Sequence, residues 1–254
     1  MTHPTTPLVT YALRLGDDAL VLSHRLGEWV TNAPQLEEDV ALANIGLDLL
    51  GQARTLLSYA GEVEGAGRSE DDLAYLRDER DFLNVHLVEL PNDDFAVSMA
   101  RQLLFSTYQL ALYDGLTAST DPTLAGVAAK AVKEVDYHRD HATQWVLRLG
   151  DGTDESHRRM QAGLDRVWPY ADELFGTDEV EQALVADGVA VDASTLRAGW
   201  DGYVDRVLDE ATLTRPDGLR TPPGGGRRGI HTEALGYLLA EMQHLHRAHP
   251  GASW

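Results

Sequence analysis

Hydrophobic positions recur at helical spacing along nearly the whole chain. The stretch from Leu36 to Ala60 is the clearest case, because its apolar residues lie three and four positions apart and mark one face of a helix. Only Val185–Val191 is rich in β-branched residues, and Asp187-Gly188 interrupts it. Breaks at proline, glycine and Asp-Pro separate the helical segments from one another. The predicted helices span Pro7–Val30, Leu36–Ala60, Glu70–Leu90, Phe95–Ala118, Asp121–Gly150, Glu155–Phe175, Asp178–Ala186, Ala193–Glu210 and Ile230–His249.

Four of these helices are long, and short breaks join them in two pairs with a longer connection between the pairs. This order is typical of a four-helix bundle. We therefore expect an all-α fold in which a four-helix bundle carries extra peripheral C-terminal helices. The length of 254 residues fits one domain over residues 1–254, with the core bundle at about 7–150 and the peripheral helices at about 155–249.

Composition narrows the class of function. The net charge is −20, from 41 acidic and 21 basic residues, which disfavours nucleic-acid binding through a general basic face. An acidic surface serves solubility or docks a basic partner, and both interpretations stay open. The absence of cysteine excludes disulfides and thiolate ligands and fits a cytoplasmic protein. We expect no signal peptide or membrane span, because no uncharged apolar run is long enough.

A polar stripe lies on the second predicted helix. Asn44, Asp48 and Gln52 are spaced i, i+4, i+8 and fall within the apolar face of that helix. Glu134 and His138 stand one turn apart on the fourth long helix. Helical bundles that hold two metals use carboxylates together with Glu-x-x-His pairs. The layout therefore resembles a metal site whose ligands have been removed.

Two aliphatic residues stand where a Glu-x-x-His pair would have its glutamate. Leu49 precedes Gln52 by three positions, and Val135 precedes His138 by three. Three interpretations are open: the polar side chains form hydrogen bonds between helices, they form a metal site with fewer ligands, or they remain from a metal site that has lost its ligands. The third long helix supplies Ser106 and two glutamines on its inner turns but no acid there.

Two further segments carry candidate chemistry. Arg215–Gly229 concentrates proline, glycine and four arginines, including Arg227 and Arg228, and is predicted to be an irregular loop. It is either a solvated linker or a contact for an anion or partner. Near the C-terminus, Glu241 and His244 form a Glu-x-x-His pair, but such pairs are common on exposed helix faces, so metal binding is the less favoured interpretation.

Five segments together resemble a known family. The segments are YALRLGDDALVLSHRLGEW, APQLEEDVALANIGLDLLGQAR, DERDFLNVHLVELPNDDFA, KAVKEVDYH and GIHTEALGYLLAEMQ. On these segments the chain is similar, from about Tyr11 to Trp254, to the C subunits of ring 1,2-phenylacetyl-CoA epoxidases, the multicomponent oxygenases of aerobic phenylacetate breakdown.

The resemblance implies a ferritin-like fold and a di-iron centre that resides in a catalytic relative of this chain, the di-iron subunit. The family's two Glu-x-x-His pairs fall here on Leu49 and Gln52 and on Val135 and His138, and the first-helix glutamate falls near Ala19 or Leu20. The chain is thus expected to have no catalytic, cofactor-binding or metal-binding residue. The vestigial pocket implied by the comparison consists of Asp48, Leu49, Gln52, Ser106, Glu134, Val135 and His138.

The family further implies a non-catalytic structural protein that binds and supports the di-iron subunit in a hetero-oligomer with the other epoxidase subunits. Di-iron, FAD, an iron–sulfur cluster and NADPH are expected on those other chains, with no nucleic acid or membrane as partner. Arg227 and Arg228 are candidate contacts to a partner or to CoA. The alternative is a ferritin-like metal-dependent oxidase acting through Asp48, Glu134 and His138. A storage bundle is least favoured, because it needs central carboxylates that this chain lacks.

Overall fold

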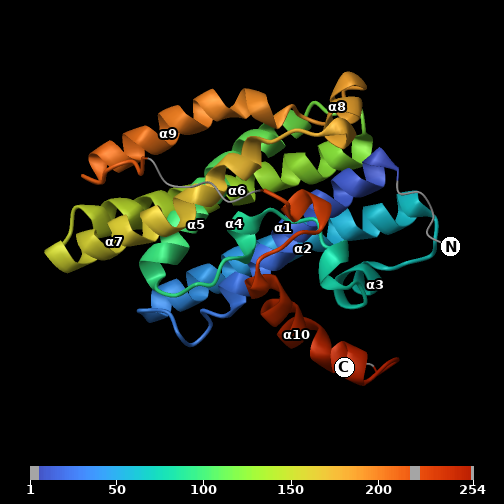
Figure 1. Ribbon diagram of the computed structural model, residues 1–254, viewed down its shortest axis with the longest axis horizontal. Coiled ribbons are helices and arrows are strands. Elements are labelled where there is room, and N and C mark those ends of the chain that lie inside the picture. The colour runs from blue at the N-terminus through green and yellow to red at the C-terminus, as the bar shows by residue number, and fades with distance from the viewer. Residues whose placement is uncertain (1–5, 218–223, 253–254) are drawn as a thin grey trace. The chain divides into compact units, whose positions relative to one another are not determined.

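A computed structural model describes residues 6–217 and 224–252, and within them all regular structure is helical (Figure 1). The chain divides into two compact units. The first combines Met1–Pro91 with Gly224–Trp254, and the second is Asn92–Pro223. Each unit contains one pair of long helices, and the shorter C-terminal helices are distributed between the units. The all-α, ferritin-like fold class is confirmed, whereas the expectation of a single domain stays a prediction.

The first unit is built on the pair α1 (Pro7–Gly27) and α2 (Leu36–Glu64), which pack along their lengths as antiparallel neighbours (Figure 1). Helix α1 begins at a proline, as the sequence predicts. Helix α2 has three acids in its first turn, where the helix dipole favours negative charge, and ends at Gly65 in the left-handed conformation (φ 68°). A Cβ at Gly16 would lie 2.9 Å from Leu57, so glycine permits this close packing.

The predicted helix Glu70–Leu90 is wrong as a single element. It consists of α3 (Glu70–Tyr75), a short 3₁₀ turn and α4 (His86–Glu89). Between the last two, Phe82 and Val85 have extended backbone angles, and the segment is hydrogen-bonded to α1. The last helix of this unit, α10 (Glu233–Ala248), packs against α3 and α4.

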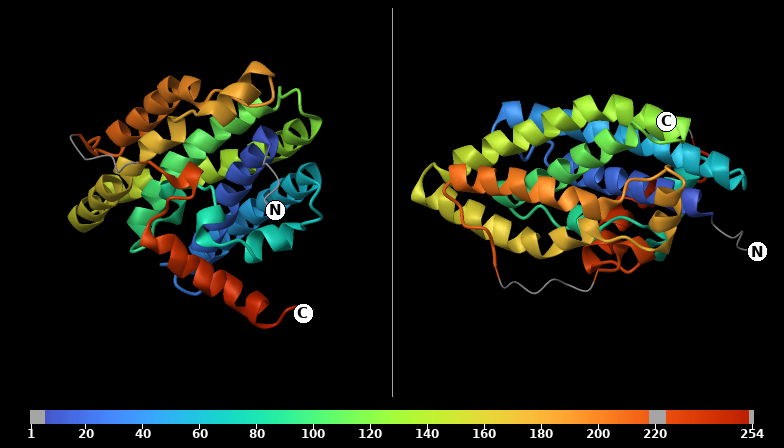
Figure 2. Two further views of the ribbon diagram at one scale, coloured as in Figure 1. Left: turned by 45° about the vertical axis from the view of Figure 1, so that its right-hand side comes forward. Right: turned by 90° about the horizontal axis from the view of Figure 1, so that it is seen from above.

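The second unit is built on α5 (Phe95–Leu116) and α6 (Pro122–Gly150), which form its long pair. Helices α7 (Asp154–Val167) and α9 (Arg197–Glu210) both pack against that pair, as the two views in Figure 2 also show. Trp200 of α9 is buried and donates its indole N–H to the carbonyl oxygen of Leu104 at 2.9 Å. The peripheral helices of this unit are therefore anchored in its core.

Several predicted boundaries need correction. The helix expected over Glu155–Phe175 ends at Val167 and continues as a 3₁₀ helix, Trp168–Phe175, because Pro169 cannot donate the next α-helical hydrogen bond. The β-branched stretch Val185–Val191 forms the end of α8 (Glu179–Ala186) and a turn at Gly188 (φ 71°).

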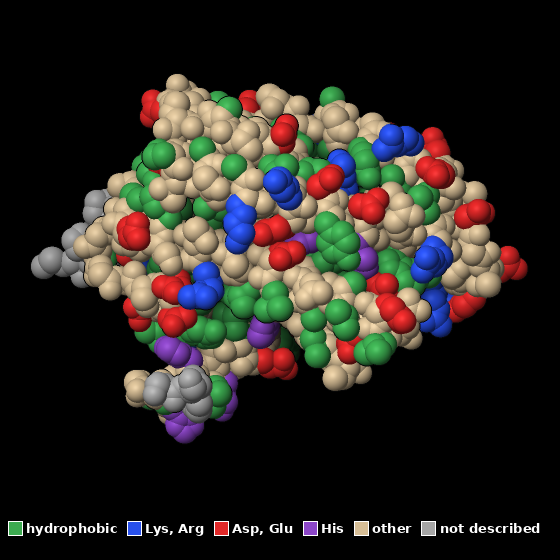
Figure 3. Space-filling model, turned by 180° about the vertical axis from the view of Figure 1, so that it is seen from behind, with side chains coloured by type: hydrophobic (Ala, Val, Ile, Leu, Met, Phe, Trp, Pro, Cys, Tyr) green, Lys and Arg blue, Asp and Glu red, His purple; other side chains and the backbone are tan. Residues whose placement is uncertain are grey.

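Acidic side chains are spread over the face of the molecule shown in Figure 3, with basic ones between them. This distribution agrees with the net charge of −20. Among the residues described, no helix is long and apolar enough to cross a membrane.

Candidate functional site

The polar stripe on α2 is only partly inward-facing. Gln52 is 4% exposed and Asp48 is half-buried, but Asn44 is exposed to solvent. Leu50, an apolar residue of the same helix, is 37% exposed. The prediction that Asn44 belongs to a buried stripe is therefore wrong, because an outer face of α2 begins beside it.

The remaining residues of the expected vestigial pocket lie on α5 and α6, in the second unit. Ser106 is buried, and its hydroxyl donates to the carbonyl oxygen of Gln102 at 2.5 Å, one turn earlier. Glu134 is half-buried, and its carboxylate lies 3.7 Å from the ammonium of Lys130. His138 is 1% exposed. The proposed hydrogen bonds between this group and the α2 residues stay a prediction.

These positions do not fit a di-iron centre. Leu49 is 1% exposed and Val135 is fully buried, and both occupy positions that the family comparison gives to glutamate ligands. Aliphatic side chains offer no donor atom, and a pair of iron ions needs several anionic oxygen ligands. Both side chains are buried, so these two positions contribute hydrophobic burial and supply no metal ligand.

A buried polar network that sequence reasoning did not identify lies in the first unit. It starts from two adjacent acids in the middle of α1. Asp17 is fully buried and forms a two-pronged ion pair with the guanidinium of Arg77. The backbone N–H of Leu83 donates to the same carboxylate at 2.8 Å. Asp17 thus satisfies a buried arginine and a buried loop amide together.

Asp18 binds the same loop and the C-terminal segment. The backbone N–H of Val85 donates to one carboxylate oxygen at 2.8 Å, and the guanidinium of Arg227 donates to the other at 2.7 Å. Burial raises the pKa of Asp18 to about 6, although Arg227 and the Val85 amide oppose that shift. Because the amides of Leu83 and Val85 are held by carboxylates, this stretch leaves the helical hydrogen-bond pattern.

The expectation for Arg227 as a partner or CoA contact is not supported. Its side chain is 15% exposed and also donates to the carbonyl oxygens of Arg14 and Leu83, both at 3.1 Å. A Cβ at Gly226 would come within 2.1 Å of the carbonyl oxygen of Asn84, so the glycines allow close backbone packing. This part of the segment is not a solvated linker.

The other arginines of that segment differ in their surroundings. Arg228 is exposed and donates to the carbonyl oxygen of Gly224 at 3.0 Å, so it remains the available candidate for an outside contact. Arg215 forms ion pairs with Asp201 and Asp205, both at 2.6 Å. Arg220 lies outside the described residues.

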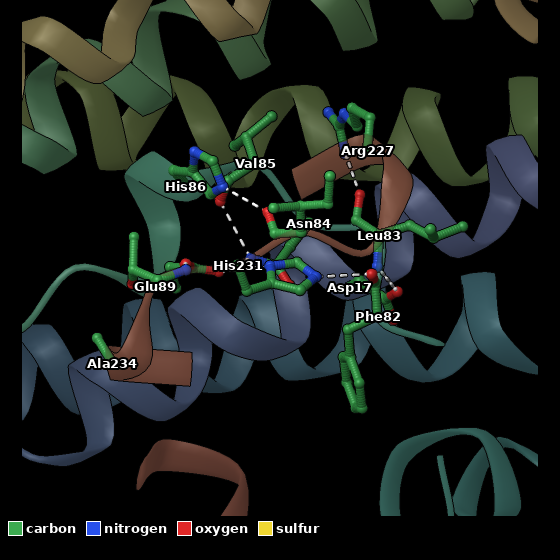
Figure 4. Close-up of polar contacts among 12 residues, drawn as sticks. Asp17, Phe82, Leu83, Asn84, Val85, His86, Glu89, Arg227, His231 and Ala234 are labelled. Carbon is green, nitrogen blue, oxygen red and sulfur yellow. Dashed lines mark hydrogen bonds and ion pairs between the residues drawn. The ribbon is translucent and has the colours of Figure 1, made fainter. Parts of the chain in front are cut away.

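Glu89 is the second centre of the network (Figure 4). Its carboxylate accepts hydrogen bonds from the Asn84 amide at 2.8 Å and from the backbone N–H of Thr232 at 2.6 Å. The ring Nδ1 of His231 lies 2.8 Å from Glu89 Oε2, and its Nε2 lies 2.8 Å from the carbonyl oxygen of Phe82. Both partners of His231 are acceptors, so the site favours the form of the ring that carries a proton on each nitrogen.

The protonation of His231 follows from these contacts. Its side chain and that of Glu89 are fully buried. Burial by itself lowers the pKa of His231, but the hydrogen bond and negative charge of Glu89 and the Phe82 carbonyl outweigh it, so the pKa is raised above 6.5. At a pH below this raised pKa, the pair is a buried imidazolium–carboxylate ion pair.

His86, Glu89 and His231 bring three metal-binding types of side chain within 4.8 Å of one another. Metal binding requires a free lone pair on each imidazole. Both ring nitrogens of His231 face acceptors, and His86 Nε2 lies 2.7 Å from the carbonyl oxygen of Ile230. The cluster therefore acts as a clamp that holds the segment after Gly224 against residues 82–89. Glu241 and His244, the other metal candidate, are both exposed on α10.

One sequence signal could have revealed this buried polar network. Asp17 and Asp18 stand together between Leu15 and Ala19 in a helix that is apolar on both sides of them. Charged residues at such positions are buried only when paired. Their partners, Arg77 and Arg227, are 60 and 209 positions away, so no local spacing identifies them.

Comparison with known proteins gives two matches. The whole chain, residues 1–254, matches the protein family described as phenylacetic acid catabolic protein. It is also 52% identical, over 249 residues, to the C subunit of the 1,2-phenylacetyl-CoA epoxidase of Escherichia coli (strain K12). That alignment covers 97% of this chain and 99% of the relative. The resemblance inferred from the five sequence segments is confirmed.

Proposed function

Because the chain belongs to the phenylacetic acid catabolic protein family, we propose that it is a non-catalytic structural subunit of a 1,2-phenylacetyl-CoA epoxidase. The observation that carries the proposal is the burial of Leu49 and Val135 at the positions where the family's catalytic relative has ligands. The chain keeps the helices of a metal-binding bundle but fills the ligand positions with apolar packing.

The internal contacts support a role as a rigid support. Buried ion pairs at Asp17, Asp18 and Glu89 hold distant segments of the first unit together. Such pairs favour one arrangement of the backbone, because any other leaves a charge unpaired in the interior. A protein whose task is to hold a catalytic partner in shape benefits from this rigidity.

In the proposed assembly the chemistry takes place on other chains. The di-iron subunit would activate oxygen and insert one atom into the aromatic ring of phenylacetyl-CoA, with electrons from NADPH through a reductase that carries FAD and an iron–sulfur cluster. This chain would bind and stabilise the di-iron subunit.

Metal analysis tests the proposal. The isolated chain, purified after expression in iron-supplemented medium, should contain well below one iron per chain. The di-iron subunit purified in parallel serves as the positive control, and mixing the two chains should yield a larger species of defined size. Two irons per chain with an oxo-bridged absorption band would refute the proposal. Oxygen uptake by this chain alone that His138→Ala abolishes would favour the oxidase at Asp48, Glu134 and His138.

A further inference from the structure

The second unit contains a cavity that the proposed function does not use. Its volume is about 470 Å³, and helices α5, α6 and α9 each contribute to its walls. The apolar part of the lining includes Leu110 and Ala111 of α5, Val132 of α6 and the buried Trp200 of α9. Sites for small molecules occupy about 300–1,000 Å³ and are lined mainly by apolar and aromatic side chains. The cavity therefore has the size and the walls of a small-molecule site.

The wall that α9 contributes combines fixed aromatic rings with open space. A Cβ built at Gly199 meets nothing within 4 Å, although the next residue, Trp200, is 1% exposed. Tyr203 is held in place, because its hydroxyl lies 3.0 Å from that of Thr143 and its ring centre 4.4 Å from the guanidinium carbon of Arg139. The aromatic wall is thus formed before any ligand binds, which lowers the entropic cost of binding.

The charged residues of the lining balance one another. Asp136 and Arg139 of α6 form an ion pair at 2.9 Å. This leaves one cation, Lys133 of α6, and one anion, Asp114 of α5, and both residues are exposed. Within the described part of the chain, neither of these two side chains forms an ion pair or a hydrogen bond. A ligand that carries one positive and one negative charge therefore complements what the lining leaves unpaired.

The hydrogen-bonding groups are divided between the two long helices in the same way. On α6, Nε of Arg139 is buried and has no acceptor among the residues that the structure describes, so this wall offers a donor in addition to the ammonium of Lys133. On α5, the hydroxyl of Thr107 donates to the carbonyl oxygen of Leu103 at 2.6 Å, so its oxygen is left as an acceptor in addition to the carboxylate of Asp114. Helix α6 therefore suits a carboxylate, and α5 suits an ammonium group.

We propose that this cavity binds a small zwitterion with an apolar side chain, of the class of the hydrophobic α-amino acids. Its carboxylate pairs with Lys133, its ammonium group pairs with Asp114, and its side chain lies against Trp200 beside Gly199. A molecule with the carboxylate alone leaves Asp114 unpaired next to a like charge, and an amine alone does the same at Lys133, so both bind more weakly. The inference is independent of the proposed function, because it uses no residue of the vestigial pocket.

Calorimetry of the isolated chain with L-phenylalanine tests the proposal, with phenylacetate and 2-phenylethylamine as analogues that each lack one charge. Phenylalanine should bind with a dissociation constant of about 1 mM or less, and each analogue at least about tenfold more weakly. Lys133→Gln and Asp114→Asn should each weaken the binding of phenylalanine by about tenfold, because each removes one charge-assisted contact. The matched control is Lys130→Gln on the same helix but outside the lining, which should bind as the wild type does.

Filling the cavity provides a second test. Gly199→Phe should abolish binding and leave thermal stability unchanged, because the new side chain enters open space. Gly202→Phe, where a Cβ also meets nothing within 4 Å but which lies outside the lining, should bind as the wild type does. The proposal is overturned if phenylalanine does not bind at about 10 mM, if phenylacetate binds equally well, or if Gly199→Phe leaves binding unchanged. Loss of di-iron subunit binding in Gly199→Phe, without any binding of phenylalanine to the wild type, would overturn it in favour of subunit docking.

Discussion

Asp17 and Asp18 are neighbours in sequence but connect different parts of the first unit. Asp17 pairs with Arg77, which follows α3, whereas Asp18 pairs with Arg227 in the C-terminal segment. Successive residues of a helix point about 100° apart, so two adjacent carboxylates can hold two separate partners. The cost of burying each charge is offset only while its partner remains in place.

Substitution Asp18→Asn should change how stability depends on pH. The folded pKa of about 6 lies above the ordinary value of 3.8, so the folded state binds more protons in this interval. The wild type should therefore gain stability relative to the variant as the pH falls from about 7 to about 4, by up to about 3 kcal/mol. Urea unfolding at several pH values measures the difference. Parallel curves for the two proteins would contradict the raised pKa.

The stability that the His231–Glu89 pair provides should also increase as the pH falls, but over a higher pH range than for Asp18. Because the folded pKa of His231 is raised above 6.5, its stabilisation is complete below about pH 6.5 and is lost as the pH rises through the folded pKa. His231→Gln should destabilise the protein by about 3 kcal/mol at pH 6, since Glu89 stays buried without its cation. The deficit, measured by chemical unfolding, should shrink at higher pH. His244→Gln, at an exposed position, is the matched control and should have no effect.

At the scale of elements, the long helices are predictable because local signals agree. Proline at the start of α6, the Asp121 side chain that accepts from Thr123 and Leu124, and a sustained apolar period all indicate the same helix. The region Glu70–Leu90 also contains helix-favouring residues, yet only two short helices and a 3₁₀ turn form. Contacts with distant acids in α1 override the local preference there, and sequence spacing cannot show them.

The close packing of the backbone around Gly226 predicts that adding one methyl group there will destabilise the protein. Gly226→Ala would place a Cβ 2.1 Å from the carbonyl oxygen of Asn84, so the C-terminal segment must shift away. We expect a loss of about 1–3 kcal/mol in unfolding free energy. The control is Gly126→Ala on α6, where nothing lies within 4 Å and the change should stabilise by about 0.5–1 kcal/mol. Equal stability of the two variants in chemical unfolding would contradict the close packing.

At the scale of the whole molecule, the sequence predicts the order of the helices but not their grouping. Periodicity places the C-terminal segment among peripheral helices, yet it belongs to the same compact unit as residues 1–91. Arg227, His231 and Gln243 all bond to partners more than 140 positions away. Such contacts depend on the fold as a whole, whereas hydrophobic periodicity reports only the local element. That Leu49 and Val135 cannot bind a metal is predictable, because an aliphatic side chain has no donor atom whatever its surroundings.

The division into two units predicts which part of the chain unfolds locally when the ion pairs of Arg227 and His231 are removed. Arg227→Leu with His231→Gln leaves Asp18 and Glu89 buried without cations, which should lower the stability of the first unit by several kcal/mol. Hydrogen exchange should then accelerate in residues 82–90 and in α10, while α5, α6 and α9 keep their protection, because cooperative units open separately. Arg228→Leu, at the exposed neighbouring position, should leave exchange unchanged. Equal acceleration in both units would instead show that the chain unfolds as the single domain expected from its length.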